Sequence, residues 1–408
     1  MIRFAPLLAL LVLGAFACER KASPPPEPAP SPEAAAKPAA PQASLEQPPP
    51  PEPQEDEESI VIGSVGSLTG AQASFGGPVR DGIQFAVEEV NAAGGVKGRR
   101  VVLRVYDSQG RLEESVSAAR RLITKDRVRL ILGDVTSSNS LAVAEVAQAA
   151  RVPMVTPSAT HADVTRKGDY IFRTCFIDSF QGQAMARFAH EHLKLKRIAI
   201  LQDGKSAYSL GLSEAFTQAF TRLGGTVASV EGYSQGDTDF RAPLLAVKQG
   251  KPQALYVPGF YGDVGLIARQ AREVGLTQPL LGGDGWESDR LFELGGNALE
   301  GSYYSSHYAV DNPSPELRRF VAAYQERYGR TPDASAALGY DAARVALAAM
   351  QRAESLTGSA IRDALAQTKD FPSVSGSITL DAARNPVKPA VILRIQDGRR
   401  QFAAAVTP

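Results

Sequence analysis

Apolar residues in the middle of the chain form short runs that alternate with a helical pattern. Leu130–Leu132 is one run, stopped by Gly133, and Val152–Val155 is a second. Between them, apolar residues over 143–150 recur at the spacing of one helix face. Short runs of this kind, bounded by turn residues, are typical of parallel strands in an α/β domain. The stretch therefore predicts strand, turn, helix and strand.

The same alternation extends over most of the chain and restarts after Arg173, which predicts two similar α/β halves. Each half is expected to hold a parallel sheet covered by helices on both faces. Strands are predicted at 59–66, 100–107, 130–132, 152–155, 197–201, 227–233, 254–257, 279–281, 377–380 and 390–395. Helices are predicted at 80–93, 115–125, 143–150, 179–193, 210–223, 242–248, 264–274, 315–328, 336–353 and 359–367.

Hydroxyl residues follow both central strands, at 136–140 and 156–160. In such sheets, ligands bind beyond the carboxyl ends of the strands. Ser137 comes where a helix begins, so free N–H groups and the positive end of the helix dipole lie beside its side chain. This arrangement suits an anion such as a carboxylate. Alternatively, Ser137 and Thr160 are only N-caps, which favour Ser and Thr.

Composition limits the classes of function. The 408 residues are enough for about two domains. Lys plus Arg and Asp plus Glu are 44 each, and this zero formal net charge gives no indication of a nucleic-acid partner. Hydrophobic residues make up 44% of the chain, which is enough for substantial cores.

Histidine and cysteine residues do not form a pattern with metal-ligand spacing. His190 and His192 are two positions apart and would point away from each other on a helix. Cys175 is interpreted as a small buried hydrophobe. The chain also lacks a Gly-x-Ser-x-Gly nucleophile elbow and a convincing Ser/His/Asp set. We therefore expect no metal, no cofactor and no enzyme activity, and an exported hydrolase is disfavoured.

The N-terminus has the features of an export signal. Arg3 precedes an apolar run over 4–16, which is too short to span a bilayer. The sequence Gly14–Cys18 resembles a bacterial lipoprotein signal, with residues 1–17 removed and lipid attached to Cys18. The alternative is an ordinary signal cleaved nearby. In both cases the protein leaves the cytoplasm, and lipidation predicts a membrane-anchored protein of the periplasm or cell envelope.

Residues 18–58 are predicted to be a disordered tether. Thirteen of the chain's 28 prolines fall between Pro24 and Pro53, mixed with Ala and Glu. This composition cannot bury enough apolar surface to fold. A Pro-rich segment is semi-rigid and would hold the folded body away from the membrane.

Several short motifs from Ile60 to Ile395 share the order and spacing of a known family. They are Gly63–Gly66 with Leu68–Gly70, Val90–Gly98, Tyr106-Asp107, Gly133–Ser138, Thr156–Thr160, Phe172–Thr174, Gln181-Gly182, Asp203–Gly211, Gly259–Tyr261 and Gly283–Trp286. With these motifs, the chain resembles the type I periplasmic binding proteins of the branched-chain amino-acid (Leu/Ile/Val) receptor family, the solute receptors of ABC importers.

The resemblance implies an α/β fold of two Rossmann-like lobes with parallel sheets, joined by three hinge strands and closing over a ligand. The implied domains are 59–176 plus 303–385 for lobe 1 and 177–302 plus 386–408 for lobe 2. The crossings are expected near Cys175–Asp178, near Glu300–Tyr303 and between Gly376 and Ala390.

The resemblance also implies a ligand site. The ligand's α-carboxylate would be held by Ser137, Ser158, Ala159 and Thr160 of lobe 1. Its α-ammonium would be held by Asp284 of lobe 2, although Gly-Asp-Gly is also an ordinary turn. Aromatic residues would line the side-chain pocket. They are Phe75, Tyr208, Phe260, Tyr261 and Trp286, of which the single tryptophan could instead serve lobe packing.

The function implied is that of an extracytoplasmic, lipid-anchored receptor. It would capture a small amino acid or related carboxylate and deliver it, as a monomer, to an ABC permease in the inner membrane. A ligand-sensing or cell-wall-synthase-activating lipoprotein on the same fold is the alternative, because fold does not fix function. The sequence leaves the ligand open among aliphatic and polar amino acids, amides and small aromatic acids.

Overall fold

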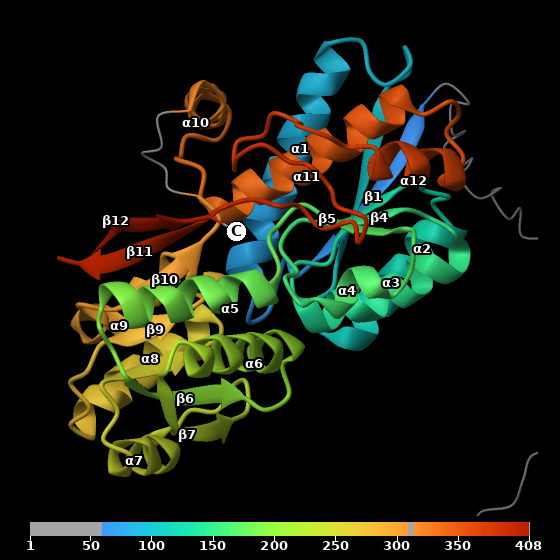
Figure 1. Ribbon diagram of the computed structural model, residues 1–408. Helices are drawn as coiled ribbons and strands as arrows, with labels where there is room; N and C mark the ends of the chain where they lie inside the picture. The colour runs from blue at the N-terminus through green and yellow to red at the C-terminus, as the bar shows by residue number, and fades with distance from the viewer. Residues whose placement is uncertain (1–58, 309–313, 408) are drawn as a thin grey trace, which may run out of the picture. The chain divides into compact units, whose positions relative to one another are not determined.

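The computed structural model describes residues 59–308 and 314–407. The predicted signal peptide, Cys18 and the predicted tether lie outside the described residues. The described chain folds into two α/β lobes, each built on its own sheet, within one compact unit (Figure 1). Among the described helices, none combines the length and apolar character needed to cross a bilayer.

Lobe 1 is built on a five-stranded sheet in which every pair of neighbours is parallel. Its strands are β1 (Ile60–Gly66), β2 (Val101–Asp107), β3 (Ile131–Gly133), β4 (Met154–Thr156) and β5 (Ile171–Arg173), in the order β2-β1-β3-β4-β5. Strands β3, β4 and β5 are buried at every position, as expected for short apolar strands covered on both faces.

Seven of the described helices belong to lobe 1. They are α1 (Ala73–Ala92), α2 (Leu112–Thr124), α3 (Ser137–Ala150), α4 (Asp163–Arg166), α10 (Pro315–Tyr328), α11 (Ala334–Arg352) and α12 (Gly358–Ala366). Helices α1 and α11 approach each other very closely. A Cβ at Gly82 would lie 2.0 Å from the carbonyl oxygen of Ala336, and one at Gly339 would lie 2.2 Å from that of Val79. Glycine at these two positions therefore sets the distance between the helices.

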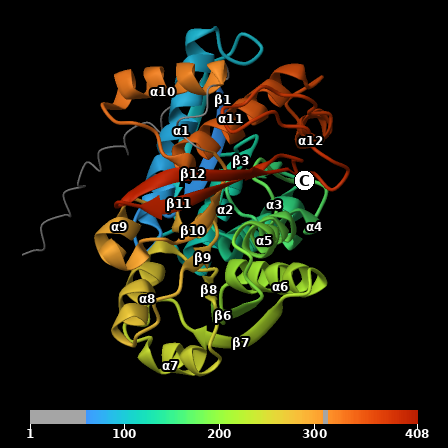
Figure 2. The same cartoon turned by 60° about the vertical axis from the view of Figure 1, so that its left-hand side comes forward.

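Lobe 2 is built on a seven-stranded mixed sheet in the order β12-β11-β10-β9-β8-β6-β7. Its strands are β6 (Arg197–Asp203), β7 (Thr226–Tyr233), β8 (Ala254–Val257), β9 (Leu280–Gly282), β10 (Tyr303–Ser306), β11 (Ala390–Gln396) and β12 (Arg399–Val406). Strands β6 to β10 are parallel, and β11 and β12 add an antiparallel edge. The views in Figures 1 and 2 show this edge where the chain returns from lobe 1.

The helices of lobe 2 flank its sheet. They are α5 (Asp178–Arg187), which continues as a π-helical turn η1 (Phe188–His192), α6 (Ala207–Arg222), α7 (Arg241–Gln249), α8 (Tyr261–Glu273) and α9 (Arg290–Gly295). Two 3₁₀ turns, η2 (Asp284–Trp286) and η3 (Gly296–Leu299), complete the lobe. The turn η2 directly follows β9, so it lies at the carboxyl end of a buried parallel strand.

The parallel parts of the two sheets share one topology. The order β2-β1-β3-β4-β5 in lobe 1 matches β7-β6-β8-β9-β10 in lobe 2. In such sheets the direction of winding reverses between the first and third strands, here between β1 and β3 and between β6 and β8. Ligands bind outside the carboxyl ends of the strands at this point. Each lobe therefore offers one potential ligand-binding position of this kind.

The predicted two-lobe α/β architecture with three crossings is confirmed. The first crossing lies at 174–177, and the third precedes β11, as expected. The second crossing is later than predicted, because 303–306 forms β10 and pairs with β9 and β11 of lobe 2. The boundary predicted at Tyr303 is therefore wrong, and the chain leaves lobe 2 at His307. The strand predicted at 377–380 forms only isolated bridges, with Phe371 and Pro386.

Candidate ligand-binding site

A cavity lies where the strand ends of the two lobes face each other. Its wall consists of Phe75, Val135, Thr136, Ser137, Ser158, Tyr208, Phe260, Asp284, Gly285, Glu287, His307, Ala334, Ser335 and Leu338. Its volume is about 40 Å³ for the centres of water-sized spheres, whereas one buried water needs about 10–15 Å³ by that measure. The cavity can therefore hold several heavy atoms of a ligand.

The cavity uses the topological switch point of each lobe. In lobe 1, Phe75 lies after β1 and Ser137 after β3. In lobe 2, Tyr208 lies after β6 and Phe260 after β8. These are the positions at which a doubly wound sheet binds ligands, so the topology alone selects this place.

The turn from β3 into α3 is held rigidly. Gly133 has φ of +126°, and a Cβ there would lie 1.9 Å from the carbonyl oxygen of Val65, so only glycine fits. The fully buried Asp134 follows. Its carboxylate accepts hydrogen bonds from the Val135 N–H and, at 3.0 Å, from the Ser115 hydroxyl. Burial raises the pKa of Asp134 despite these bonds. The turn thereby fixes the position of Ser137.

Ser137 and Ser158 present hydroxyls to the cavity from lobe 1. Ser137 is the first residue of α3, and its Oγ accepts the N–H of His161 at 3.2 Å. Its own proton therefore remains available for a ligand. Ser158 instead donates to the carbonyl oxygen of Val135 at 2.7 Å, so its hydroxyl can offer only an acceptor in this conformation. Ser137 and the start of α3 are the anion-seeking part of the wall.

Ala159 and Thr160 lie behind the cavity wall. The Ala159 N–H donates to Thr156 Oγ1 at 3.1 Å, and its carbonyl oxygen accepts from Arg173 Nη1 at 2.8 Å. Thr160 is almost fully buried, and its carbonyl oxygen accepts the N–H of Asp178 at 2.9 Å. Their predicted contacts with a ligand stay predictions, because neither residue lines the cavity in this structure.

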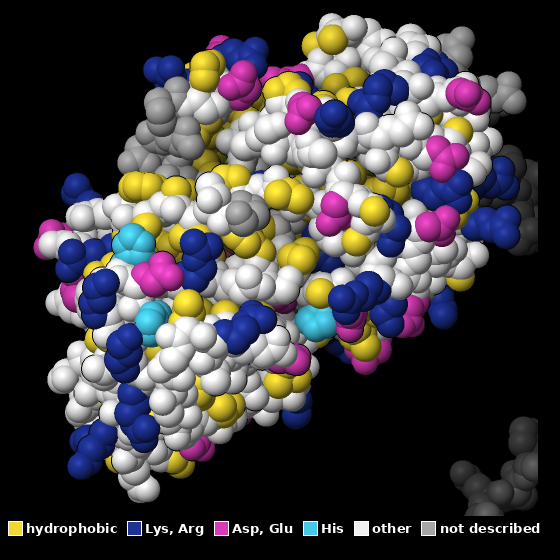
Figure 3. All heavy atoms as spheres, viewed as in Figure 1, with side chains coloured by type: hydrophobic (Ala, Val, Ile, Leu, Met, Phe, Trp, Pro, Cys, Tyr) yellow, Lys and Arg dark blue, Asp and Glu magenta, His cyan; other side chains and the backbone are white. Residues whose placement is uncertain are grey.

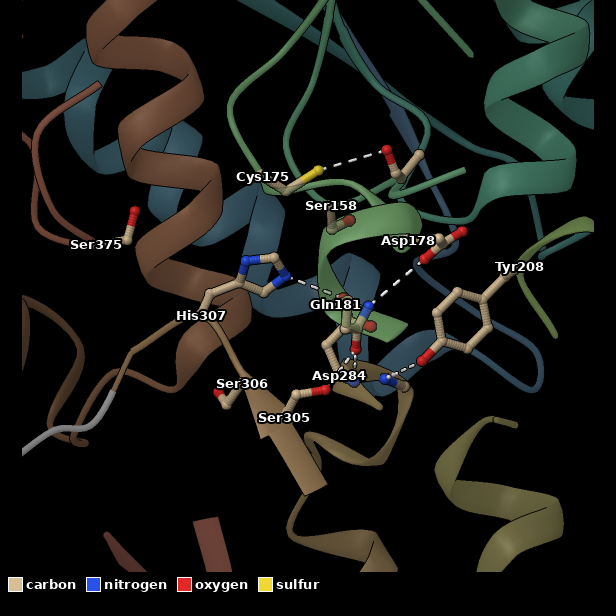
Figure 4. Close-up of polar contacts among 12 residues, drawn as sticks. Ser158, Cys175, Asp178, Gln181, Tyr208, Asp284, Ser305, Ser306, His307 and Ser375 are labelled. Carbon is tan, nitrogen blue, oxygen red and sulfur yellow. Dashed lines mark hydrogen bonds and ion pairs between the residues drawn. The ribbon is translucent and has the colours of Figure 1, made fainter. Parts of the chain in front are cut away.

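Asp284 supplies a carboxylate from lobe 2. Its Oδ2 lies 2.9 Å from His307 Nε2, while Oδ1 is buried without a hydrogen-bond partner among the described residues. Its N–H donates to Gln181 Oε1 at 2.8 Å, and Ser305 Oγ donates to the same oxygen at 2.7 Å (Figure 4). The protein thus fixes the backbone and one oxygen of Asp284. The other oxygen has no hydrogen-bond partner among the described residues.

His307 lines the cavity, although no motif in the sequence indicates this role. Its side chain is 2% exposed, and its ring stacks on Phe176 with centroids 3.7 Å apart. Burial lowers the pKa of His307, while the hydrogen bond to Asp284 opposes this shift. No motif surrounds His307 in the sequence, and it follows β10, which was not predicted. Seven other wall residues were missed as well: Val135, Thr136, Gly285, Glu287, Ala334, Ser335 and Leu338.

Three of the five predicted aromatic residues line the cavity. The rings of Tyr208 and Phe260 stack with centroids 5.2 Å apart, and Phe75 approaches Phe260 edge-on at 5.9 Å. The Tyr208 hydroxyl accepts the N–H of Gly285 at 3.0 Å, next to Asp284. The aromatic wall is therefore shared between the lobes, with Phe75 on one side and the stacked pair on the other.

Tyr261 and Trp286 lie outside the cavity wall. The Tyr261 hydroxyl donates to the carbonyl oxygen of Ala71 at 2.6 Å and joins α8 of lobe 2 to the start of α1 in lobe 1. Trp286 is fully buried, and its Nε1 donates to the carbonyl oxygen of Val257 at 3.0 Å within lobe 2. Trp286 therefore packs within lobe 2, which is the alternative considered for it in the sequence.

The charges of the wall are divided between the lobes. Lobe 2 contributes the carboxylates of Asp284 and Glu287, whereas Lys and Arg do not occur among the lining residues. Lobe 1 contributes Ser137 and the positive end of α3. The cavity therefore complements a small molecule with a negative end and a positive end. Among the described residues, no group of His, Cys, Asp and Glu is placed to hold a metal ion.

Comparisons with known proteins point to one family. The sequence model described as "Periplasmic binding protein" matches residues 59–400. A Leu/Ile/Val-binding protein homolog of Brucella melitensis is 32% identical over 344 residues, which are 83% of this chain and 92% of the relative.

Solved structures agree with this match. The crystal structure of a leucine-binding protein of Thermotoga maritima has a TM-score of 0.82 and 39% identity, with 86% of this chain and 99% of that chain covered. The branched-chain amino acid transporter substrate-binding protein of Streptococcus pneumoniae, in complex with isoleucine, has a TM-score of 0.81 and 32% identity, with 86% and 100% covered.

Proposed function

Because the chain belongs to the periplasmic binding protein family, among its branched-chain amino-acid receptors, we propose that it captures a branched-chain amino acid between its lobes for an ABC importer. The observation that carries this proposal is the opposition of charges across one cavity. Ser137 and the start of α3 lie on one side, and the unpartnered Oδ1 of Asp284 lies on the other.

The proposed binding pose follows from these groups. The α-carboxylate accepts the Ser137 hydroxyl and the free N–H groups of the first turn of α3. The α-ammonium donates to Asp284 Oδ1. Hydrogen bonds to charged groups contribute about 1.5–3 kcal/mol each, so both ends are needed to offset desolvation of a zwitterion. The aliphatic side chain would contact Phe75, Val135 and Leu338, the apolar part of the wall.

Closure of the lobes is favoured because one ligand binds both of them. Lobe 2 already contacts lobe 1 through the Tyr261–Ala71 hydrogen bond, and the Ala207 N–H donates to Ser138 Oγ at 3.2 Å. A ligand shifts a hinge equilibrium only by its differential affinity for the two states. A zwitterionic ligand can contact Ser137 and Asp284 at the same time only in the closed state. The binding energy of these two contacts therefore favours closure.

Titration calorimetry of the protein with leucine, isoleucine and valine tests the proposal. We expect saturable binding of at least one of them, and thermal unfolding should confirm it. A ligand at 100 times its dissociation constant adds about 2.7 kcal/mol of apparent stability. The absence of saturable heat with all three amino acids would overturn the proposal.

Delivery to a permease and lipid anchoring through Cys18 complete the proposed function. The similarity to a branched-chain amino acid transporter substrate-binding protein of Streptococcus pneumoniae supports a role in transport. Neighbouring permease and ATPase genes, and ligand-dependent uptake by that permease, would favour transport over a sensing role. Their absence would favour the sensing or cell-wall-synthase-activating alternative.

A further inference from the structure

The proposed ammonium site contains a second titratable group, because His307 shares the carboxylate of Asp284. We propose that His307 is a specificity-determining residue that directs Asp284 toward the ligand's ammonium when neutral and takes the place of that ammonium when protonated. This inference rests on the proposed function, since it concerns the same cavity. It adds that the choice of ligand depends on the protonation state of His307.

The geometry assigns the proton of the neutral ring. His307 Nε2 lies 2.9 Å from Asp284 Oδ2. A carboxylate oxygen accepts, so Nε2 carries the hydrogen and Nδ1 is the free basic nitrogen. The stack on Phe176, at an interplanar angle of 20°, holds the ring in this orientation. One carboxylate oxygen is therefore occupied by the protein, and Oδ1 alone is left for a ligand.

The charges around His307 come from several elements. Asp284 lies after β9 and Lys388 belongs to the third crossing, while Glu287 lines the same cavity. Cys175 and Asp178, in the first crossing and at the start of α5, interact electrostatically with Asp284. Burial lowers the pKa of His307, Asp284 raises it, and the charge of Lys388 lowers it further. Burial has the largest effect, so the ring is neutral near neutral pH and gains its second proton only in acid.

Protonation changes which ligand the cavity accepts. An imidazolium beside Asp284 already neutralises the carboxylate, so a ligand ammonium then brings a second cation to one anion. Binding of an amino acid should weaken. A carboxylic acid of the same shape without the amino group should bind better, because the imidazolium compensates the charge that would otherwise stay unpaired. The affinity ratio of the two ligands therefore reports the charge of His307.

Calorimetry on the full protein tests this with leucine and its desamino analogue, 4-methylpentanoate, between about pH 5 and pH 8, the range in which His changes charge. For the unmodified protein we expect the ratio of leucine affinity to analogue affinity to fall in acid by up to about tenfold per pH unit, the limit for one linked proton. In His307→Gln, which keeps an N–H donor but does not titrate, the ratio should be independent of pH over this range.

The ratio of the two ligand affinities, compared between variants, distinguishes the titration of His307 from that of other groups. Burial raises the pKa of Asp178 to about 8 and that of Asp333 to about 6, and both groups remain in His307→Gln. His192→Gln is the matched control, because His192 is exposed and lies outside the cavity. It should retain the slope of the unmodified protein. The same slope in His307→Gln as in the unmodified protein would overturn the inference.

Two further outcomes distinguish this inference from the proposed function. If leucine does not bind at any pH, the proposed function fails and the inference fails with it. If His307→Gln does not fold, proton NMR titration of the unmodified protein decides, with the other three histidines assigned by single substitutions. Saturating leucine should then lower the pKa of His307 and 4-methylpentanoate should raise it. Equal effects of the two ligands would contradict the inference.

Discussion

Asp284 is the residue on which ligand recognition depends in this account. Its side chain is 11% exposed, its Oδ2 is paired with His307, and its N–H is fixed by Gln181. The side chain of Asp is shorter than that of Glu, so its carboxylate reaches less far into a cavity. The hydrogen bond to His307 fixes the direction of this shorter carboxylate.

Replacing Asp284 by Asn removes the charge and keeps the shape of the side chain. We expect leucine binding to weaken by roughly 1.5–3 kcal/mol, the contribution of a hydrogen bond to a charged group, without loss of the fold. Calorimetry measures the affinity, and thermal unfolding verifies the fold. Asp263→Asn is the control, because this mostly buried aspartate of lobe 2 lies outside the cavity. Equal affinities in both variants would contradict the role of Asp284.

Sequence reasoning identified part of the cavity wall. Ser137 and Asp284 could be predicted because each follows a strand of a parallel sheet and lies in a motif of the family that the chain resembles. His307 could not, because its role depends on a contact with a residue 23 positions earlier in the chain. Trp286 follows the same strand as Asp284, but its side chain turns into the lobe, and motif spacing does not determine side-chain direction.

At the scale of elements, helix α8 contacts lobe 1 beside the cavity. Its first residue, Tyr261, donates to the carbonyl oxygen of Ala71 at 2.6 Å, just before α1. Its ring also meets Phe75 edge-on, with centroids 5.1 Å apart. These contacts join α8 to the segment that leads into α1, so they should stabilise the closed conformation.

Tyr261→Phe should weaken ligand binding modestly, by about 0.5–1.5 kcal/mol, the net value of one hydrogen bond. The effect should appear mainly as faster ligand dissociation in stopped-flow measurements. Tyr328→Phe is the matched control, because its hydroxyl donates to the carbonyl oxygen of Asp81 within lobe 1. A similar change in dissociation rate for Tyr328→Phe would show that Tyr261 has no special role in closure.

A buried lysine holds the third crossing, the segment before β11, in place by hydrogen bonds. Lys388 Nζ donates to Ser375 Oγ at 2.6 Å and to the carbonyl oxygen of Thr174, in the first crossing, at 3.4 Å. The N–H and hydroxyl of Ser375 both donate to the carboxylate of Asp341 on α11. All three side chains are buried, so the crossing is connected to α11 by a chain of polar contacts with opposite charges at its ends.

Lys388→Met should lower the free energy of unfolding by about 3–5 kcal/mol, because Asp341 would remain buried without its cation. Denaturant unfolding measures the change. The double variant Lys388→Met/Asp341→Asn should recover part of the loss, since it removes the uncompensated charge. Lys125→Met, at an exposed lysine, should change stability by less than about 0.5 kcal/mol. An equally small effect of Lys388→Met would contradict the account of this crossing.

Elements with a clear apolar pattern could be predicted, and those without one could not. The strand at 254–257 and the helix at 315–328 were predicted with the bounds observed. Strand β10 has the sequence Tyr-Tyr-Ser-Ser, which lacks an apolar run, and it exists because β9 and β11 pair with it on both sides. Strand β12 was missed for a similar reason, since it is mostly exposed and pairs only with β11.

At the scale of the whole molecule, charge and the proposed lipid anchor bear on where the protein works. The formal net charge is zero, and the face in Figure 3 shows both basic and acidic side chains on each lobe. Attraction to an anionic surface through a basic excess is therefore not expected. The predicted lipid on Cys18 is then the feature that would hold the protein at a membrane.

Cys18→Ser removes the predicted site of lipidation. We expect the protein to move from the membrane fraction to the periplasmic or culture fluid, with leucine affinity unchanged because Cys18 lies far outside the residues of the cavity in the sequence. Detergent phase partitioning of the two forms measures this. Cys175→Ser is not a suitable control, because Cys175 is buried within the first crossing. Ser23→Ala, in the tether, should leave the membrane association unchanged.

The central claim is that one zwitterion connects the two lobes, with its negative end at α3 and its positive end at Asp284. A crystal structure of the protein with leucine tests this most directly. The account predicts the carboxylate within hydrogen-bonding distance of Ser137 Oγ and the amino group within hydrogen-bonding distance of Asp284 Oδ1. Leucine bound in the opposite orientation, or bound elsewhere with the cavity empty, would contradict it.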